Sequence, residues 1–265
     1  MFHVKQYKVM KFCLVGYPIS HSLSPLVHNE IGELTGIQCE YILEECESLN
    51  IDYIKKNYDG FNVTMPFKEK VMDYIDELTD VSKNINSVNT VKIKNGRLLG
   101  HSTDGIGFLK DFKKTFHKDF NNKNICILGT GATARSIAYE INKENPKNIF
   151  FFSRNKKGEN IFSYNNKEIV KECEILVNTT PWGMKENPPL ITEKELNEKM
   201  IIYDVIYNRK TELLTEGEKI GAKVSNGMGM LIWQAFFAQR FWLDDSSFSF
   251  YKQIKKEQNN YEIQR

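Results

Sequence analysis

The chain has 265 residues, of which 41% are apolar and 12% aromatic, enough for substantial hydrophobic cores. Its 36 Lys and Arg residues nearly balance its 34 Asp and Glu residues, and the net charge of +2 gives no field that would favour a nucleic acid or a membrane surface. We therefore expect two compact domains and a small-molecule partner, with no nucleic-acid or membrane partner.

The five cysteines are scattered and form no CxxC pair, which indicates a reducing compartment. The N-terminal apolar stretch is too brief for a signal peptide, and no run approaches the ~18 apolar residues of a membrane helix. His21 and His28 have no metal-ligand spacing with any Cys or Asp, so we expect structural histidines and no metal. These features predict a soluble, cytoplasmic protein.

Short apolar or β-branched segments alternate with amphipathic ones, a rhythm typical of βαβ units on a parallel sheet. In the first half of the chain we expect helices that begin at Pro25 and near Leu49, and strands near Lys11–Val15, Cys39–Leu43 and Phe61–Val63. Residues 87–93 and 97–101 flank Asn95-Gly96, the strongest short hairpin signal, so an antiparallel pair interrupts the parallel series.

Two segments of this half carry candidate functional groups. Ser22 and Ser24 lie beside a helix start, with Ser24 as the predicted N-cap and Pro25 at the first helical position. Such a place binds carboxylates, although Ser24 capping its own helix explains the segment equally well. A second helix is expected to open at Pro66, which puts Lys68 in its first turn, against the helix dipole. That lysine is then either a solvated side chain or a functional one.

A second parallel series follows in the rest of the chain. We expect a helix from about Thr133, a last helix over Met228–Trp242, and strands over Asn124–Leu128, Asn148–Phe152, Ile175–Asn178, Ile201–Val205 and Lys223–Ser225. This is a doubly wound sheet in its own right.

A glycine-rich turn joins the first strand of this series to its helix. Gly129-Thr130-Gly131 is followed by Ala132-Thr133, and such a turn lets backbone N–H groups and the helix dipole bind a pyrophosphate. A lone GxG is weak evidence and also fits an ordinary tight turn, but here the flanking strand and helix are both predicted.

The next strand ends in Ser153-Arg154-Asn155-Lys156-Lys157, where an NAD enzyme would present a carboxylate to the ribose 2′-hydroxyl. Arg154 and the lysines would instead attract a 2′-phosphate, and Arg154 could form a forked contact with it. A solvated basic loop is the alternative. The position relative to Gly129 favours NADP as cofactor.

Seven short motifs follow one another along almost the whole chain. They are Gly16–Asn29, Gly60–Glu69, Val88–Thr90, Gly100–Gly107, Asn178–Met184, Asp204–Asn208 and Asn226–Gln234, besides the glycine turn. In this order they resemble the shikimate dehydrogenase family. The sequence departs from the family's usual residues at Ala132, which replaces the third glycine of the turn, at Ser102, which replaces an Asn, and at Asn86, which replaces a Gly.

The resemblance implies an α/β, two-domain fold: an N-terminal α/β substrate domain plus a Rossmann-type, doubly wound NADP-binding domain. The substrate-binding and catalytic domain would comprise 1–104 and 235–265, and the NADP domain 105–234. Lys68 and Asp104 would form the catalytic pair. Substrate would be bound by Ser22, Ser24, Thr64, Asn89, Asp104, Tyr207 and Gln234. Cofactor would be bound by Gly129, Thr130, Gly131, Ala132, Thr133, Ser153, Arg154, Asn155, Thr180, Ile206, Gly227 and Met230.

The activity implied by the resemblance is the NADPH-dependent, reversible reduction of 3-dehydroshikimate to shikimate, in the pathway to aromatic amino acids, by a monomer or a homodimer. Two of these residues also have simpler structural roles. Asp104 would be the N-cap of the helix that follows it, and Gln234 would form a hydrogen bond with a backbone carbonyl. The alternative functions are a quinate/shikimate dehydrogenase of relaxed specificity, and a weakly active NADP-binding regulatory relative.

Overall fold

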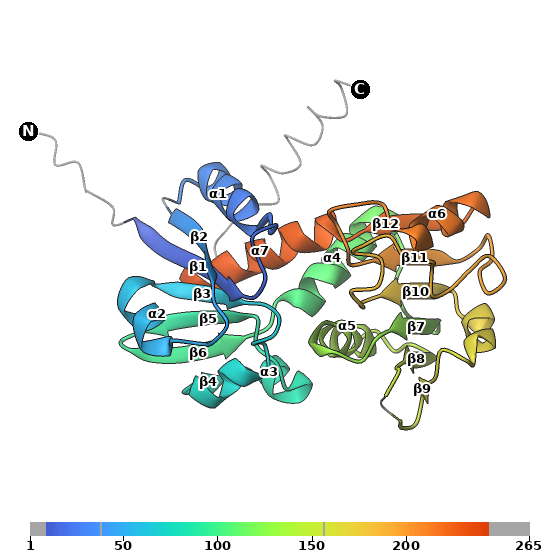
Figure 1. The fold of residues 1–265 in the computed structure, drawn as a ribbon, viewed down its shortest axis with the longest axis horizontal. Coiled ribbons are helices and arrows are strands. Elements are labelled where there is room, and N and C mark those ends of the chain that lie inside the picture. The colour runs from blue at the N-terminus through green and yellow to red at the C-terminus, as the bar shows by residue number, and fades with distance from the viewer. Residues whose placement is uncertain (1–8, 38, 156, 244–265) are drawn as a thin grey trace, which may run out of the picture. The chain divides into compact units, whose positions relative to one another are not determined.

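A computed structural model describes residues 9–37, 39–155 and 157–243. The chain divides into two compact units (Figure 1). The first contains the described residues of Met1–Thr79, Val88–His101 and Ala235–Arg265, and the second contains Asp80–Ser87 and Ser102–Gln234. Each unit has its own six-stranded sheet. The predicted two-domain α/β fold is confirmed.

The sheet of the first unit is mixed and runs in the order β2-β1-β3-β5-β6-β4. Its strands are β1 (Met10–Gly16), β2 (Cys39–Glu45), β3 (Gly60–Val63), β4 (Glu77–Leu78), β5 (Thr90–Lys94) and β6 (Arg97–His101). β1 pairs in parallel with both β2 and β3, whereas β5 is antiparallel to β3 and β6. The predicted hairpin is confirmed, because Asn95 and Gly96 both adopt positive φ angles between β5 and β6, as a tight hairpin turn requires.

The helices of the first unit correct two predictions about local structure. α1 (Ser24–Thr35) begins one residue earlier than expected, so its N-cap is Leu23 and Ser24 is already helical. No helix opens at Pro66: a turn leads to a 3₁₀ helix, η1 (Lys70–Tyr74), and Lys68 lies in the turn. The expected conflict of Lys68 with a helix dipole is therefore absent. α2 (Ile51–Asn57) is capped by the Asn50 side chain.

Hydrophobic clusters cover both faces of this sheet. On one face, side chains of β1 and β3 pack with α2 and η1; the cluster includes Val15, Ile54, Phe61 and Val71. On the other face, Phe12 of β1 stacks on Trp242 of α7 (Met228–Leu243) at 4.1 Å between ring centroids. The Trp242 indole N–H also donates to the Val91 carbonyl, which attaches the end of α7 to the sheet.

The sheet of the second unit is entirely parallel, in the order β12-β11-β10-β7-β8-β9. Its strands are β7 (Asn124–Leu128), β8 (Asn148–Phe152), β9 (Ile161–Phe162), β10 (Ile175–Asn178), β11 (Ile201–Asp204) and β12 (Lys223–Asn226). Counted from β7, this is the order of a dinucleotide-binding Rossmann fold, with the reversal between β7 and β10. β9 was not predicted from the sequence.

Helices and 3₁₀ turns accompany this sheet: α3 (Asp80–Ile85), α4 (Asp104–Phe116), α5 (Ala132–Asn142), η2 (Lys167–Glu172) and α6 (Glu212–Lys219). α4 and α5 are packed so closely that an added Cβ at Gly105 would collide with the backbone carbonyl of Ser136. The N-cap of α4 is Thr103, so Asp104 is its first helical residue and the reading of Asp104 as an N-cap is wrong. None of the helices described is long and apolar enough to cross a bilayer.

His28 lies at the centre of a buried aromatic group in the first unit. Its ring stacks on Tyr41 at 4.0 Å and is inaccessible to solvent, and neither nitrogen has a hydrogen-bond partner among the described residues. Burial lowers the pKa of His28 to about 3. The imidazole is therefore neutral in the folded protein and fills space in the core.

We predict that Gly105→Ala lowers the free energy of unfolding by about 2–3 kcal/mol, because the methyl group forces α4 away from α5. Chemical denaturation measures the loss. Gly131→Ala is the control, since nothing lies within 4 Å of a Cβ there, and it should lower stability by about 1 kcal/mol at most, because alanine is a poorer N-cap of α5 than glycine. Equal losses in the two variants would contradict the close packing.

The buried His28 predicts a specific dependence of stability on pH. Below its unfolded pKa of 6.5, the unfolded chain binds a proton that the folded protein excludes, so stability falls as pH falls toward about 3. Between pH 7 and pH 5 the free energy of unfolding should fall by about 2 kcal/mol more in the wild type than in His28→Phe, a variant that keeps a stacking ring. Urea unfolding at both pH values tests this, with the exposed His21→Gln as control. A wild type and His28→Phe with parallel pH profiles would contradict it.

Candidate functional site

The glycine turn after β7 has the geometry that its sequence predicts. Gly129 adopts a φ of 106°, and its amide donates to the Phe152 carbonyl at the end of β8. A Cβ at Gly129 would lie 2.7 Å from Thr179 Oγ1, so glycine is required both for the backbone angle and for the space.

Gly131 is the N-cap of α5, and Ala132 and Thr133 are its first two helical residues. The first turn of this helix has no acidic side chain, so its free N–H groups and positive dipole end are suited to an anion. Arg135 supports the turn: it donates to the Thr130 carbonyl and to the carbonyls of Ile85 and Asn86, all within the second unit.

The loops after β10 and β11 are joined by two buried polar side chains. Asn178 accepts hydrogen bonds from the Thr180 amide and hydroxyl and donates to Asp204 Oδ1 at 3.0 Å. Asp204 also accepts from the Ile206 amide and the Thr211 hydroxyl. Burial raises the pKa of Asp204 to about 6, while these hydrogen bonds act in the opposite direction. Thr180 and Ile206, both predicted at the cofactor, are thus fixed by one network.

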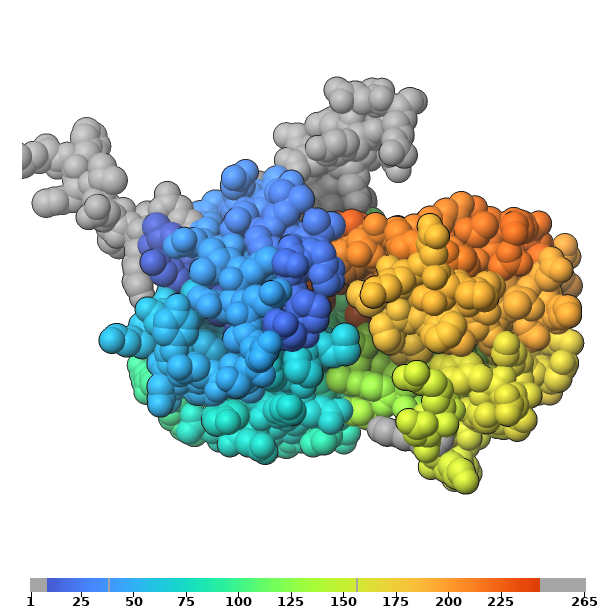
Figure 2. Space-filling model, in the orientation of Figure 1, coloured from blue at the N-terminus to red at the C-terminus, as the bar shows by residue number. Residues whose placement is uncertain are grey.

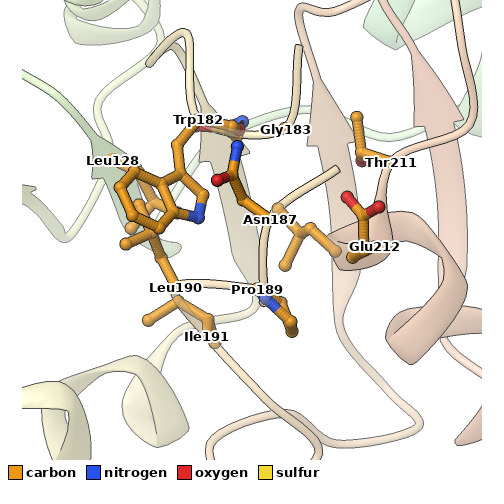
Figure 3. A pocket seen from close by; sticks show the side chains of 11 residues that line it. Leu128, Trp182, Gly183, Asn187, Pro189, Leu190, Ile191, Thr211 and Glu212 are labelled. Atoms are coloured by element: carbon orange, nitrogen blue, oxygen red, sulfur yellow. Dashed lines mark hydrogen bonds between the residues drawn. The ribbon is translucent and has the colours of Figure 1, made fainter. Parts of the chain in front are cut away.

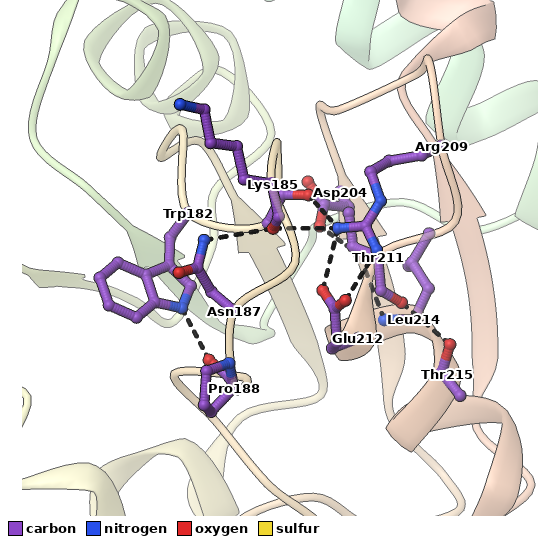
Figure 4. Close-up of polar contacts among 11 residues, drawn as sticks. Trp182, Lys185, Asn187, Pro188, Asp204, Arg209, Thr211, Glu212, Leu214 and Thr215 are labelled. Carbon is purple, nitrogen blue, oxygen red and sulfur yellow. Dashed lines mark hydrogen bonds and ion pairs between the residues drawn. The ribbon is translucent and has the colours of Figure 1, made fainter.

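Arg209 extends this network to the loop that follows Thr180. Its guanidinium donates to the carbonyls of Gly183 and Lys185 and forms a two-pronged ion pair with Glu212 (Figure 4). The Trp182 indole donates to the Pro188 carbonyl and closes the loop on itself. A small hollow lies beside this loop, lined by Leu128, Trp182, Asn187, Ile191 and Thr211 among others (Figure 3). No individual role was predicted for Asn178, Asp204 or Arg209, which lack any periodic signal.

Gly227 and Met230, predicted at the cofactor, lie around the start of α7. The Gly227 amide donates to the Ile206 carbonyl, and a Cβ at Gly227 would collide with the Val205 backbone. Met230 is buried in the core of the second unit. These two residues therefore belong to the same edge of the sheet as the loop after β11.

The predicted phosphate-binding loop after β8 lies at the protein surface. Arg154 and Asn155 are exposed, and the Asn155 amide donates to Ser153 Oγ. Figure 2 shows the segment between β8 and β9 in yellow-green at the surface of the second unit. Lys156 falls outside the described residues, and Lys157 is exposed. The loop is thus accessible to a ligand.

In the first unit, the predicted substrate residues gather at the adjoining ends of β1, β3 and β5. The Thr64 amide donates to the Val15 carbonyl, the Val63 amide to the Asn89 carbonyl, and the Val88 amide to the Lys68 carbonyl. Backbone hydrogen bonds therefore bring Thr64, Lys68 and Asn89 together. Lys68 is partly exposed, whereas Asn89 is buried.

Ser22 and Ser24 follow β1 in the same unit. Their hydroxyl oxygens are 3.1 Å apart, and the Ser24 amide donates to Ser22 Oγ. Ser24 is buried and Ser22 partly exposed, so the pair presents two neighbouring hydroxyl groups at the start of α1.

Asp104, Tyr207 and Gln234 belong to the second unit. Asp104 is buried at the start of α4, and Tyr207 is partly exposed. Gln234 donates to the Leu231 carbonyl at 3.0 Å, the simpler of the two partners expected for it. No three His, Cys, Asp or Glu side chains within the described ranges are grouped as metal ligands.

Comparison with known proteins identifies similar chains over nearly the full length. Residues 14–91 match the family model for the shikimate dehydrogenase substrate binding domain. A relative from Methanococcus vannielii named shikimate dehydrogenase (NADP(+)) is 36% identical over 261 residues, which cover 89% of this chain and 92% of the relative. One from Aquifex aeolicus with the same name is 34% identical over 86% of this chain and 89% of its own.

Solved structures agree with the sequence relatives. A crystal structure of a shikimate dehydrogenase in complex with NADP+ has a TM-score of 0.81 at 34% identity and covers 89% of this chain and 91% of its own. The shikimate 5-dehydrogenase from Thermus thermophilus, in complex with NADP(H) and shikimate, has a TM-score of 0.79 at 26% identity, covering 88% and 93%.

Proposed function

The chain belongs to the shikimate dehydrogenase family, and from that membership we propose that it catalyses the reversible, NADPH-dependent reduction of 3-dehydroshikimate to shikimate. The observation that carries the proposal is similarity over nearly the whole chain to relatives named NADP-dependent, together with a glycine turn at the N-terminus of α5. The scattered free cysteines favour the cytoplasm as its location. We expect the enzyme to act as a monomer or a homodimer.

We assign the substrate to residues 1–104 and 235–265 and the cofactor to residues 105–234. Pyrophosphate would lie on the N–H groups of Gly129–Thr133, where the α5 dipole is positive. Ser153, Arg154 and Asn155 would bind the 2′-phosphate of the adenosine ribose, since these three residues offer a guanidinium and no carboxylate. The remaining cofactor residues would be Thr180 and Ile206, on loops that Asn178 and Asp204 hold together, and Gly227 and Met230, around the start of α7.

The substrate carboxylate would be bound by the hydroxyls of Ser22 and Ser24, which already lie next to each other. Thr64, Asn89, Asp104, Tyr207 and Gln234 would contact the remaining polar groups of the ring. Three of the residues in the first unit converge by backbone pairing: Thr64, Lys68 and Asn89. That convergence supports a binding role for this edge of the sheet.

When bound, NADPH would supply the hydride that reduces the C3 carbonyl carbon. Negative charge then develops on the carbonyl oxygen, and the Lys68 ammonium donates a proton to it. Asp104 would accept a hydrogen bond from a hydroxyl of the substrate ring and so orient the ring for this transfer. In the reverse direction neutral Lys68 accepts the hydroxyl proton.

A spectrophotometric assay tests the proposal: with shikimate and NADP+, the purified protein should form NADPH. Quinate and NAD+, each replacing one component, should give kcat/KM values at least about tenfold lower. Equal use of quinate would instead support the enzyme of relaxed specificity. No turnover with any pair would support a regulatory relative.

Lys68→Ala should lower kcat by about 100-fold or more while the shikimate dissociation constant changes less than about tenfold, as expected for a proton donor acting in the transition state.

Arg154→Ala should raise the KM for NADPH by at least about tenfold, because it removes a charge-assisted contact with the 2′-phosphate. The KM for NADH, which lacks that phosphate, should change less than about twofold. The exposed Lys118→Ala, which removes a positive charge from the second unit before β7 begins, is the control and should leave both KM values unchanged. If Arg154→Ala weakens both cofactors equally, the loop does not read the 2′-phosphate.

A further inference from the structure

Three buried polar side chains form a hydrogen-bonded network that reaches Asn89 in the first unit. Its members are Tyr41 of β2, Asn62 of β3 and Thr90 of β5, each less than 5% exposed. They lie on three different strands and contact one another through side-chain hydrogen bonds of 2.8–3.0 Å. Buried polar groups of this kind are costly unless each bond is made, so their orientations are strongly constrained.

The orientation of the Asn62 amide is fixed by a backbone group. Asn62 Nδ2 lies 3.0 Å from the Asn89 carbonyl oxygen. A carbonyl can only accept a hydrogen bond, so this end of the amide must be the NH₂ group. Asn62 Oδ1 then accepts from the Tyr41 hydroxyl at 2.8 Å. Burial raises the pKa of Tyr41 well above its usual value of 10, so the phenol keeps the proton that this bond needs.

The Asn62 amide in turn determines the direction of the hydrogen bonds made by Thr90. The second Asn62 Nδ2 proton is donated to Thr90 Oγ1 at 3.0 Å. Thr90 therefore has its own hydroxyl proton to donate, and it donates it to Asn89 Oδ1 at 2.9 Å. The oxygen of the Asn89 amide is thus directed at Thr90, and the opposite end of that amide is its NH₂ group, a hydrogen-bond donor.

We propose that Tyr41, Asn62 and Thr90 are positioning residues that make Asn89 present its NH₂ group, rather than its oxygen, to an acceptor oxygen of the substrate. This inference rests on the proposed function, which places Asn89 at a substrate hydroxyl. Thr90 is inaccessible to solvent and cannot contact a substrate itself, so its effect on a substrate passes through Asn89. A reversed amide would present an oxygen that requires a donor, so the network selects a substrate oxygen free to accept.

Thr90→Val tests the proposal, because it keeps the shape of the side chain and removes the hydroxyl that fixes the Asn89 amide. The KM for shikimate should rise by about tenfold, with the KM for NADP+ unchanged within about twofold. Thr90→Ser, which restores the hydroxyl, should return the shikimate KM to within about threefold of wild type. A purely structural role of Thr90 would change both KM values together.

A double-mutant cycle separates action through Asn89 from other effects. In an Asn89→Ala background, Thr90→Val should raise the shikimate KM by less than about twofold, because no amide is left to orient. A full effect in that background, or equal behaviour of Thr90→Val and Thr90→Ser, would overturn the proposal. Should Thr90→Val fail to fold, Thr90→Ala replaces it, with the same pattern expected in both backgrounds. Turnover by the wild type tests the proposed function separately from these differences.

Discussion

Parallel strand pairing is the constraint on which the candidate site depends. β7, β10, β11 and β12 all end at the same edge of the second sheet, so the turns that follow them must share that edge. The turns contain Gly129, Thr180, Ile206 and Gly227, which are separated by up to about a hundred positions in sequence. Their proximity follows from the strand order, and the Asn178–Asp204 pair then fixes two of the loops relative to each other.

Turns that share one edge of a sheet bring backbone segments into close contact, and glycine is needed where a Cβ would collide. This explains several glycines of the motifs. A side chain at Gly129 would meet Thr179, and one at Gly227 would collide with the Val205 carbonyl. Gly229 lies against the Asp111 carboxylate, which accepts a hydrogen bond from Tyr203 at 2.7 Å and so cannot readily move away. The glycines around the start of α7 thus permit contacts within the second unit, apart from any role toward a ligand.

The sequence predicted the strands well, because their apolar runs are local signals bounded by turn residues. Most strands with such a run begin and end within a few residues of the predicted positions, whereas the two-residue strands β4 and β9 are too short to carry a pattern. The turn at Lys68 was missed because Pro66 suits turns as well as helix starts. The Asn62 network could not be predicted, since it joins strands whose polar residues are 21 to 28 positions apart.

The departures from the family's usual residues are accommodated by the local structure. Asn86 replaces a glycine and adopts a φ of 51°, a conformation that Asn tolerates better than most residues, and its carbonyl still accepts from Arg135. Ser102 lies 3.2 Å from Ser136 Oγ, which accepts from the Gly105 amide and so secures the start of α4 next to Asp104. Ala132 is the first residue of a helix, where no positive φ is needed. Asn86 and Ala132 thus adopt backbone conformations that their side chains tolerate, and Ser102 contacts the side chain that secures α4.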